Sequence, residues 1–145
     1  MNPISPRLFG WILLVGLLWL PSGAEPARLR ACDRLGNTVE LRQFEGEPVL
    51  LAFMAFWCDT WKPLLVDLKK LKFTGQIVLI AVDSRERQGV EEQMIQAELP
   101  FQLWLDLDQQ LVRHYQVSTV PTLILLDRKQ TVVQRHQGFP GQRVL

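Results

Sequence analysis

The hydrophobic pattern of this chain is organised around residues 49–71. Eight consecutive apolar residues, 49–56, follow Gly46 and Pro48, and a run of this kind predicts a central strand that is covered on both faces. Apolar residues then recur at helical spacing, which predicts an amphipathic helix directly after the strand. They are Trp61, Leu64, Leu65, Leu68 and Leu71. Cys58 lies at the junction of the predicted strand and helix.

Two further segments extend this unit on either side. Residues 30–41 alternate around a turn at 34–37 and predict a β-hairpin. Residues 77–82 (IVLIAV) predict a second buried strand, so that strand, helix and strand form a right-handed βαβ unit.

The second half of the chain continues the α/β pattern. Residues 101–105 alternate and predict an edge strand, and residues 122–126 and 131–134 predict a hairpin. Asp106 to Asp108 predict a turn and a helix cap. Short helices are predicted around two apolar sets, which are Val90, Met94 and Ala97, and Leu111, Val112 and Tyr115. Only seven residues follow Gly138, so the prediction is one mixed α/β domain whose final helix is missing or truncated.

The N-terminus predicts an export signal. The apolar run at residues 8–20 would span about 20 Å as a helix, too short for a bilayer core of about 30 Å. Pro21 and small residues follow, which predicts a signal peptide at 1–24 and a mature domain at 25–145. The alternative is an uncleaved anchor, because Arg7 is the one charged side chain before the run.

Charge and cysteine content limit the class of partner. Without residues 1–24 the chain has 15 basic and 15 acidic side chains, which argues against a nucleic-acid footprint or a polybasic membrane patch. We expect an exported protein, periplasmic or otherwise extracytoplasmic, that contacts a membrane only if its N-terminal segment stays attached. In such a compartment a disulfide of Cys32 or Cys58 can persist.

Cys58 is the candidate reactive residue. The start of a helix presents unpaired backbone N–H groups and the positive end of the helix dipole, which favour a thiolate. Asp59 beside the thiol opposes this effect, and the alternative role is a buried structural cysteine. His114 and His136 have no metal-ligand spacing. We expect no metal and no cofactor.

The order of elements, the Trp-Cys pair at a strand-to-helix junction and the Val-Pro-Thr before a late hairpin resemble the thioredoxin fold. The segments DRLGNTVELRQFEGEPVLLAF and LDLDQQLVRHYQVSTVPTLILLD, with an inserted helix and strand at 89–105, resemble the extracytoplasmic TlpA-type thiol–disulfide oxidoreductases. The similarity covers residues 29–138. It implies a thioredoxin-like fold with a central mixed sheet flanked by helices.

The resemblance departs from this family at the active site. The family carries CxxC, in which the second sulfur resolves the mixed disulfide, whereas this chain has Cys58-Asp59-Thr60-Trp61. The family's polar residue six positions before the cysteine is Ala52 here, and the glutamate that some members have six positions after it is Leu64. Pro63 is tolerable only in the first helical turn, so Asp59 or Thr60 should cap that helix.

The resemblance also implies a binding edge. Val120 and Pro121 match the family's cis-proline position, where an extended peptide pairs with the backbone, so we predict a cis bond there. Trp57 and Trp61 would flank the sulfur, with core packing as the alternative for Trp61. Cys32 is either a substitute resolving cysteine or an isolated thiol.

Three functions remain open. The first is thiol–disulfide exchange through Cys58 alone, acting on extracytoplasmic protein thiols or disulfides. The second is a non-catalytic module that binds peptides or proteins at the Val120–Pro121 edge. The third is a thiol peroxidase, although that family has threonine three residues before its cysteine and this chain has Ala55.

Overall fold

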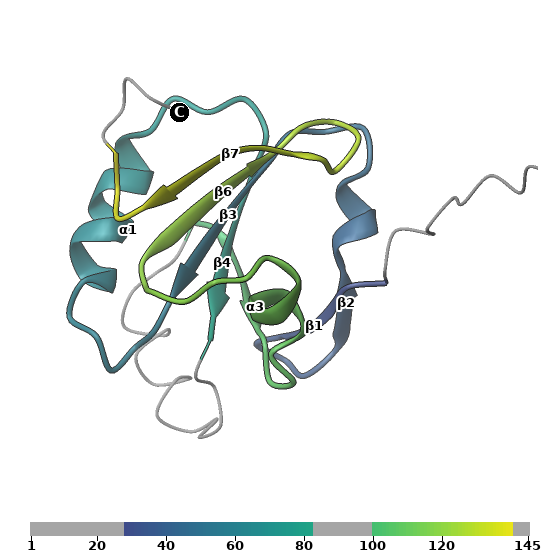
Figure 1. Cartoon of the computed structure of the whole chain (residues 1–145), viewed down its shortest axis with the longest axis horizontal. Helices are drawn as coiled ribbons and strands as arrows, with labels where there is room; N and C mark the ends of the chain where they lie inside the picture. The colour runs from purple at the N-terminus through teal and green to yellow at the C-terminus, as the bar shows by residue number, and fades with distance from the viewer. Residues whose placement is uncertain (1–27, 83–99, 141–145) are drawn as a thin grey trace, which may run out of the picture.

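The computed structural model describes residues 28–82 and 100–140. Within these ranges seven strands form one sheet with the order β2-β1-β5-β4-β3-β6-β7 (Figure 1). The strands are β1 (Arg30–Asp33), β2 (Thr38–Glu40), β3 (Val49–Met54), β4 (Gln76–Ala81), β5 (Gln102–Leu105), β6 (Thr122–Leu126) and β7 (Val132–Gln137). The described helical elements are η1 (Leu41–Phe44), α1 (Trp61–Lys70) and α3 (Gln110–His114).

The middle of the sheet is parallel and its margins are antiparallel. Strands β3, β4 and β5 run in the same direction, while β6 is antiparallel to β3 and β7 is antiparallel to β6. The hairpin of β1 and β2 joins the other side through an antiparallel pairing of β1 with β5. Every residue of β3 is buried, as predicted from its uninterrupted apolar run.

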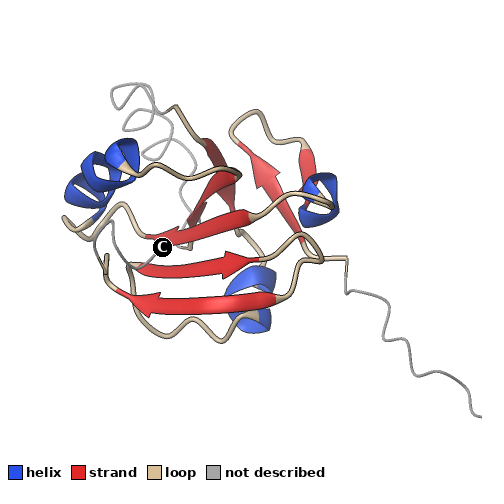
Figure 2. Cartoon of the chain, turned by 90° about the horizontal axis from the view of Figure 1, so that it is seen from above, coloured by secondary structure: helices blue, strands red, loops and turns tan. Residues whose placement is uncertain are grey.

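Alternation along the strands divides the core between two faces of the sheet. Leu50, Ala52 and Met54 pack with the apolar stripe of α1. Val49, Leu51 and Phe53 point to the opposite face and pack with residues of η1 and α3. Helices therefore lie on both sides of the sheet (Figure 2). This agrees with the predicted α/β class, and each fully buried leucine or phenylalanine contributes about 1.5–3 kcal/mol.

The prediction that residues 101–105 form an edge strand is wrong. Strand β5 lies inside the sheet, between β4 and β1, and Leu103, Trp104 and Leu105 are buried. Trp104 stacks on Phe44 of η1, with ring centroids 5.7 Å apart. The alternation of a four-residue strand shows which side chains are buried, but it does not show which strands form hydrogen bonds to it.

Two predictions concern residues that the structure does not describe. The signal segment at 1–24 and the helix around Val90, Met94 and Ala97 lie outside the described residues, as do the last five residues of the chain. Within residues 28–82 and 100–140, no helix combines the length and the apolar character needed to cross a membrane.

Candidate active site

The predicted functional residues gather at the end of the sheet where the parallel strands finish. Cys58 follows β3, Val82 follows β4, and the loop from α3 to β6 returns to the same end. Ligand sites of open α/β sheets form at the carboxyl ends of their strands. A groove of about 400 Å³ lies here. Its lining residues are Trp57, Cys58, Val82, Gln109, Val112, Val117, Ser118, Thr119 and Val120.

Cys58 lies in a tight turn between β3 and α1. Its backbone N–H donates to the carbonyl of Ala55 at 3.3 Å, and its own carbonyl accepts from the N–H of Trp61 at 3.3 Å. Cys58 is partly exposed, and its Sγ lies 3.0 Å from Oγ1 of Thr60. A hydroxyl at this distance can donate a hydrogen bond to a sulfur that carries negative charge. The turn therefore presents the sulfur to the groove with a hydrogen-bonding partner.

The helix begins three residues after Cys58. Thr60 occupies the N-cap position of α1 and Pro63 is its third residue, which agrees with the prediction that Pro63 lies in the first turn. The Thr60 side chain makes no capping hydrogen bond; its hydroxyl contacts the Cys58 sulfur instead. Because proline has no backbone N–H, the start of α1 also has one donor fewer than an ordinary helix.

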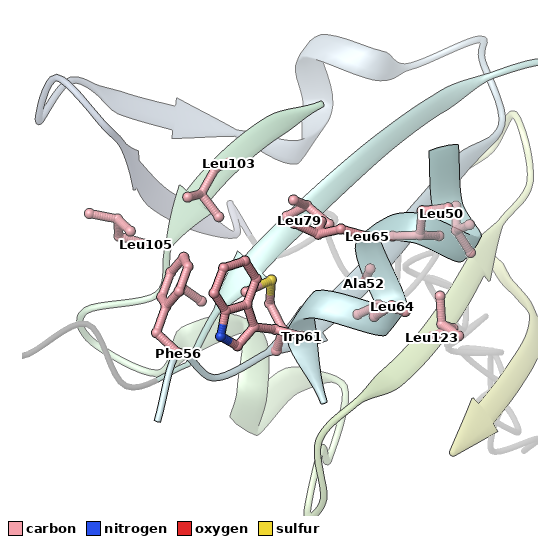
Figure 3. Close-up of a cluster of buried hydrophobic side chains, with 13 residues drawn as sticks. Leu50, Ala52, Phe56, Trp61, Leu64, Leu65, Leu79, Leu103, Leu105 and Leu123 are labelled. Atoms are coloured by element: carbon pink, nitrogen blue, oxygen red, sulfur yellow. The ribbon is translucent and has the colours of Figure 1, made fainter. Parts of the chain in front are cut away.

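Trp61 occupies the position of the family's second cysteine and belongs to the core. The side chain is only 8 % exposed, and its indole packs edge-to-face against Phe56 with centroids 5.4 Å apart (Figure 3). The structure therefore places Trp61 in the core, which was the alternative expectation, and not beside the sulfur. Trp57 is different, because it is 72 % exposed and lines the groove.

The Val120–Pro121 segment closes the other side of the groove. Its peptide bond is cis, and Val120 is one of the lining residues. Two hydrogen bonds hold the segment against β6 and β7: the hydroxyl of Thr122 donates to the carbonyl of Thr119 at 2.7 Å, and Gly138 N–H donates to the carbonyl of Pro121 at 2.8 Å. Within the described residues, the N–H and C=O of Val120 form no backbone hydrogen bond.

Cys32 is not among the residues that line this groove. It is in β1, and the strand order places β1 three positions from β3. Three inter-strand spacings amount to about 14 Å, whereas disulfide-bonded residues have Cα atoms about 4.4–6.8 Å apart. Both cysteines are free thiols. The strand order gives no support to the suggestion that Cys32 resolves an adduct, and that role stays a prediction.

The sequence pattern alone does not point to much of the groove wall. Val82, Val112 and Val117 supply apolar surface, and Gln109 adopts a left-handed backbone conformation with φ 53°. These residues follow or face the carboxyl ends of the parallel strands. Once the strands of the sheet are assigned, that position would identify them as groove residues.

Asp106 holds this part of the wall in place, as its predicted capping role requires. Its buried carboxylate accepts hydrogen bonds from the N–H groups of Leu111 at 3.2 Å and Val112 at 2.8 Å. Because Val112 lines the groove, the cap also fixes the groove wall. Across the described ranges, no three His, Cys, Asp or Glu side chains come together as a metal site would require.

A cysteine after a central parallel strand, beside a cis-proline that precedes an antiparallel strand, defines the thioredoxin-like class of proteins. Solved structures share this fold. The exposed lipoprotein thioredoxin of Streptococcus pneumoniae aligns with TM-score 0.68 at 20% identity, covering 79% of this chain and 91% of that one. StoA from Bacillus subtilis aligns with TM-score 0.67 at 21% identity, covering 79% and 90%.

The chain belongs to the AhpC/TSA family, whose model matches residues 24–135. It is 30% identical over 121 residues to the thiol-disulfide oxidoreductase ResA of Bacillus thuringiensis, a match that covers 80% of this chain and 69% of the relative. The predicted relationship to TlpA-type thiol–disulfide oxidoreductases is thereby confirmed.

Proposed function

We propose that this protein exchanges thiols and disulfides through Cys58 alone. The observation that supports this most directly is that Cys58 is partly exposed and lines the groove, with its Sγ 3.0 Å from the Thr60 hydroxyl. Its relatives are thiol–disulfide oxidoreductases. The buried Trp61 occupies the position that holds the second cysteine in a CxxC protein. This chain therefore has no neighbouring thiol to resolve a mixed disulfide as a CxxC protein does.

The reaction is a nucleophilic displacement at sulfur. The Cys58 thiolate attacks one sulfur of a substrate disulfide, a new Cys58–substrate disulfide forms, and the other substrate sulfur leaves as a thiolate that takes a proton from solvent. The Thr60 hydroxyl stabilises the attacking sulfur by donating its hydrogen bond. Since Trp61 cannot attack the adduct, an external thiol must release it. That thiol attacks the substrate sulfur and returns Cys58 as a thiolate.

The groove favours a peptide or protein substrate. The unpaired N–H and C=O of Val120 can form backbone hydrogen bonds with an extended segment next to the substrate sulfur. Trp57 and the groove valines supply apolar contacts for its side chains. Pro121 has no N–H and its carbonyl accepts from Gly138, so pairing starts at Val120.

We place this exchange outside the cytoplasm. The support is the short apolar run at residues 8–20, followed by small residues. Export should remove residues 1–24 and leave a mature protein that begins at Glu25. The substrates are then extracytoplasmic protein thiols or disulfides. Mass spectrometry that finds Met1 to Leu20 on the exported protein would contradict the cleavage and make the protein membrane-anchored.

The test of the exchange is to trap the adduct. The protein is treated with a peptide disulfide, quenched with acid and analysed by mass spectrometry with fragmentation. We expect a mixed disulfide at Cys58 that persists until a thiol is added. Cys58→Ser should abolish it, and Cys32→Ser, which removes the other cysteine, should leave its yield and lifetime unchanged. Absence of an adduct while Cys58 is a free thiol would refute the proposal.

A non-catalytic binding module is the second candidate. It is favoured by the apolar groove wall and the exposed Trp57 indole, neither of which needs the sulfur. Peptide binding that is unchanged in Cys58→Ser, with no adduct in the parent protein, would support this candidate. A thiol peroxidase would instead consume peroxide rapidly, but Ala55 has no side-chain hydroxyl to assist a peroxide.

A further inference from the structure

The Cys58 groove is lined by neutral residues. In the described part of the chain, none of its lining residues carries a charged side chain. A groove of this kind selects its substrate through apolar contacts and through hydrogen bonds between neutral groups. Besides Cys58 and the indole of Trp57, the polar side chains of the lining belong to Gln109, Ser118 and Thr119. Gln109 supplies the amide in this set, with two donor hydrogens and an acceptor oxygen.

Gln109 has a backbone conformation that side chains disfavour. Its φ is 53°, in the left-handed region that glycine adopts freely and that other residues adopt at a cost in free energy. Residues in such conformations cluster at active sites and ligand-binding sites. A side chain is therefore present at this position of the groove wall although glycine would suit the backbone better.

The unused hydrogen-bonding groups of Gln109 are in its side chain. Its backbone N–H donates to the carbonyl of Asp106 at 3.0 Å, and its carbonyl accepts from the N–H of Arg113 at 3.0 Å. Its side-chain amide forms no hydrogen bond with any described residue. Because Gln109 lines the groove and is partly exposed, this amide is accessible to a bound substrate.

Two other glutamines of the described ranges have left-handed backbones, and they differ from Gln109 in their surroundings. Gln130 has φ 64°, and its side-chain Nε2 donates to the carbonyl of Phe44 at 3.0 Å, so its amide is used within the fold. Gln116 has φ 50° and is exposed, and it does not line the Cys58 groove. Gln116 therefore has the conformation of Gln109 without its place in the groove.

We propose that Gln109 is a specificity-determining residue for exchange at Cys58, an inference that rests on the proposed function. Its side-chain amide forms a hydrogen bond with a peptide group beside the substrate cysteine, in addition to the pairing of the same segment with Val120. Gln109 thus accelerates exchange with disulfides of peptides and proteins. A small disulfide without peptide groups gains nothing from it.

The test compares the rates at which two disulfides form an adduct with Cys58, followed by acid quench and mass spectrometry. One is the disulfide of an acetylated and amidated Ala-Cys-Ala peptide, and the other is bis(2-hydroxyethyl) disulfide, which has no peptide group. Gln109→Met keeps the length of the side chain and removes the amide. It should slow the reaction of the peptide disulfide about three- to tenfold, the value of one hydrogen bond, and leave the rate of the small disulfide unchanged.

Two further variants control for effects on the fold. Gln116→Met makes the same replacement at a left-handed residue outside the groove, and it should change neither rate. Gln109→Gly should fold at least as well as the parent, because glycine suits φ 53°, and its thermal midpoint checks this. It should slow the peptide disulfide as Gln109→Met does.

Three results would overturn the role of Gln109 while the parent protein still forms its adduct. They are an unchanged peptide rate in Gln109→Met, an equal slowing of both disulfides, which would mean that Gln109 acts on Cys58 and not on the substrate, and an equal slowing by Gln116→Met. Absence of any adduct in the parent protein, with both disulfides, would instead refute the exchange itself and this inference with it.

Discussion

Trp61→Cys introduces a second sulfur one turn after Cys58 and tests the single-cysteine mechanism. The N–H of Trp61 donates to the carbonyl of Cys58 at 3.3 Å, so the two residues already have the i, i+3 relation of a turn. Residues in this relation have side chains about 5–6 Å apart, close enough for a disulfide after a small adjustment. The new thiol should attack the Cys58 adduct and release the substrate without an external thiol.

The substitution also has a cost in stability. Removing a buried tryptophan destabilises a protein by about 3–5 kcal/mol, and Trp61 is 8 % exposed and packs against Phe56. Cysteine fills little more space than alanine, so Trp61→Ala is the matched control for the cavity. Both variants should lose similar stability in denaturant unfolding, and only Trp61→Cys should gain a resolving thiol.

The assay follows the Cys58 adduct over time by acid quench and mass spectrometry, with no added thiol. A tethered thiol acts at millimolar effective concentration or above, so the adduct of Trp61→Cys should decay at least tenfold faster than the parent adduct. The adduct of Trp61→Ala should persist. Equal decay in Trp61→Cys and Trp61→Ala would show that the lost indole, and not the sulfur, releases the substrate. Decay at the parent rate in a folded Trp61→Cys would show that the two sulfurs do not meet.

Three other predictions follow from the structure. Thr60→Val removes the hydroxyl beside Cys58 and should slow alkylation of that thiol at neutral pH about three- to tenfold, the value of one hydrogen bond; an unchanged rate would contradict a role for the contact. Burial raises the pKa of Tyr115 to about 12. The neutral side chain therefore contributes its full stabilisation, about 2–3 kcal/mol of the free energy of unfolding, below the unfolded pKa of about 10. This contribution is lost as the pH rises through 12. Tyr115 is the only tyrosine in the chain, so tyrosinate absorbance measures it directly, and Tyr115→Phe should remove this alkaline loss. Asp106→Ala leaves two backbone N–H groups of α3 without their acceptor and should cost about 2 kcal/mol in denaturant unfolding, while an unaffected midpoint would mean that water replaces the carboxylate.

The fold was largely predictable because its strands are strongly apolar. The eight-residue run at 49–56 identified β3, and the helical stripe from Trp61 to Leu68 identified α1. Which strands lie next to each other was harder to predict, because pairing depends on hydrogen bonds between segments that are distant in the sequence. The pairing of β1 with β5 made residues 102–105 interior, and nothing in those residues signals it.

The position of Cys58 in the candidate site was predictable, and the residues around it were less so. Cys58, Trp57 and Val120 share one groove, as expected, because the resemblance supplied their positions. The sequence could not show that the Thr60 hydroxyl contacts the sulfur, since a residue in a turn can point in several directions. The place of Cys32 beside β5 depends on the order of the strands, which is known only when all strands are placed.

The buried indole at position 61 changes how this protein would respond to its redox surroundings. A protein with two neighbouring cysteines stores two electrons, and its oxidised fraction depends on the disulfide concentration divided by the square of the thiol concentration. With Cys58 alone, one mixed disulfide forms for each thiol released, so the modified fraction depends on the simple ratio of disulfide to thiol. Diluting the whole pool at a fixed ratio would oxidise a two-cysteine protein further and leave this one unchanged. Cys58 would therefore report the composition of the surrounding thiol pool and not its total concentration.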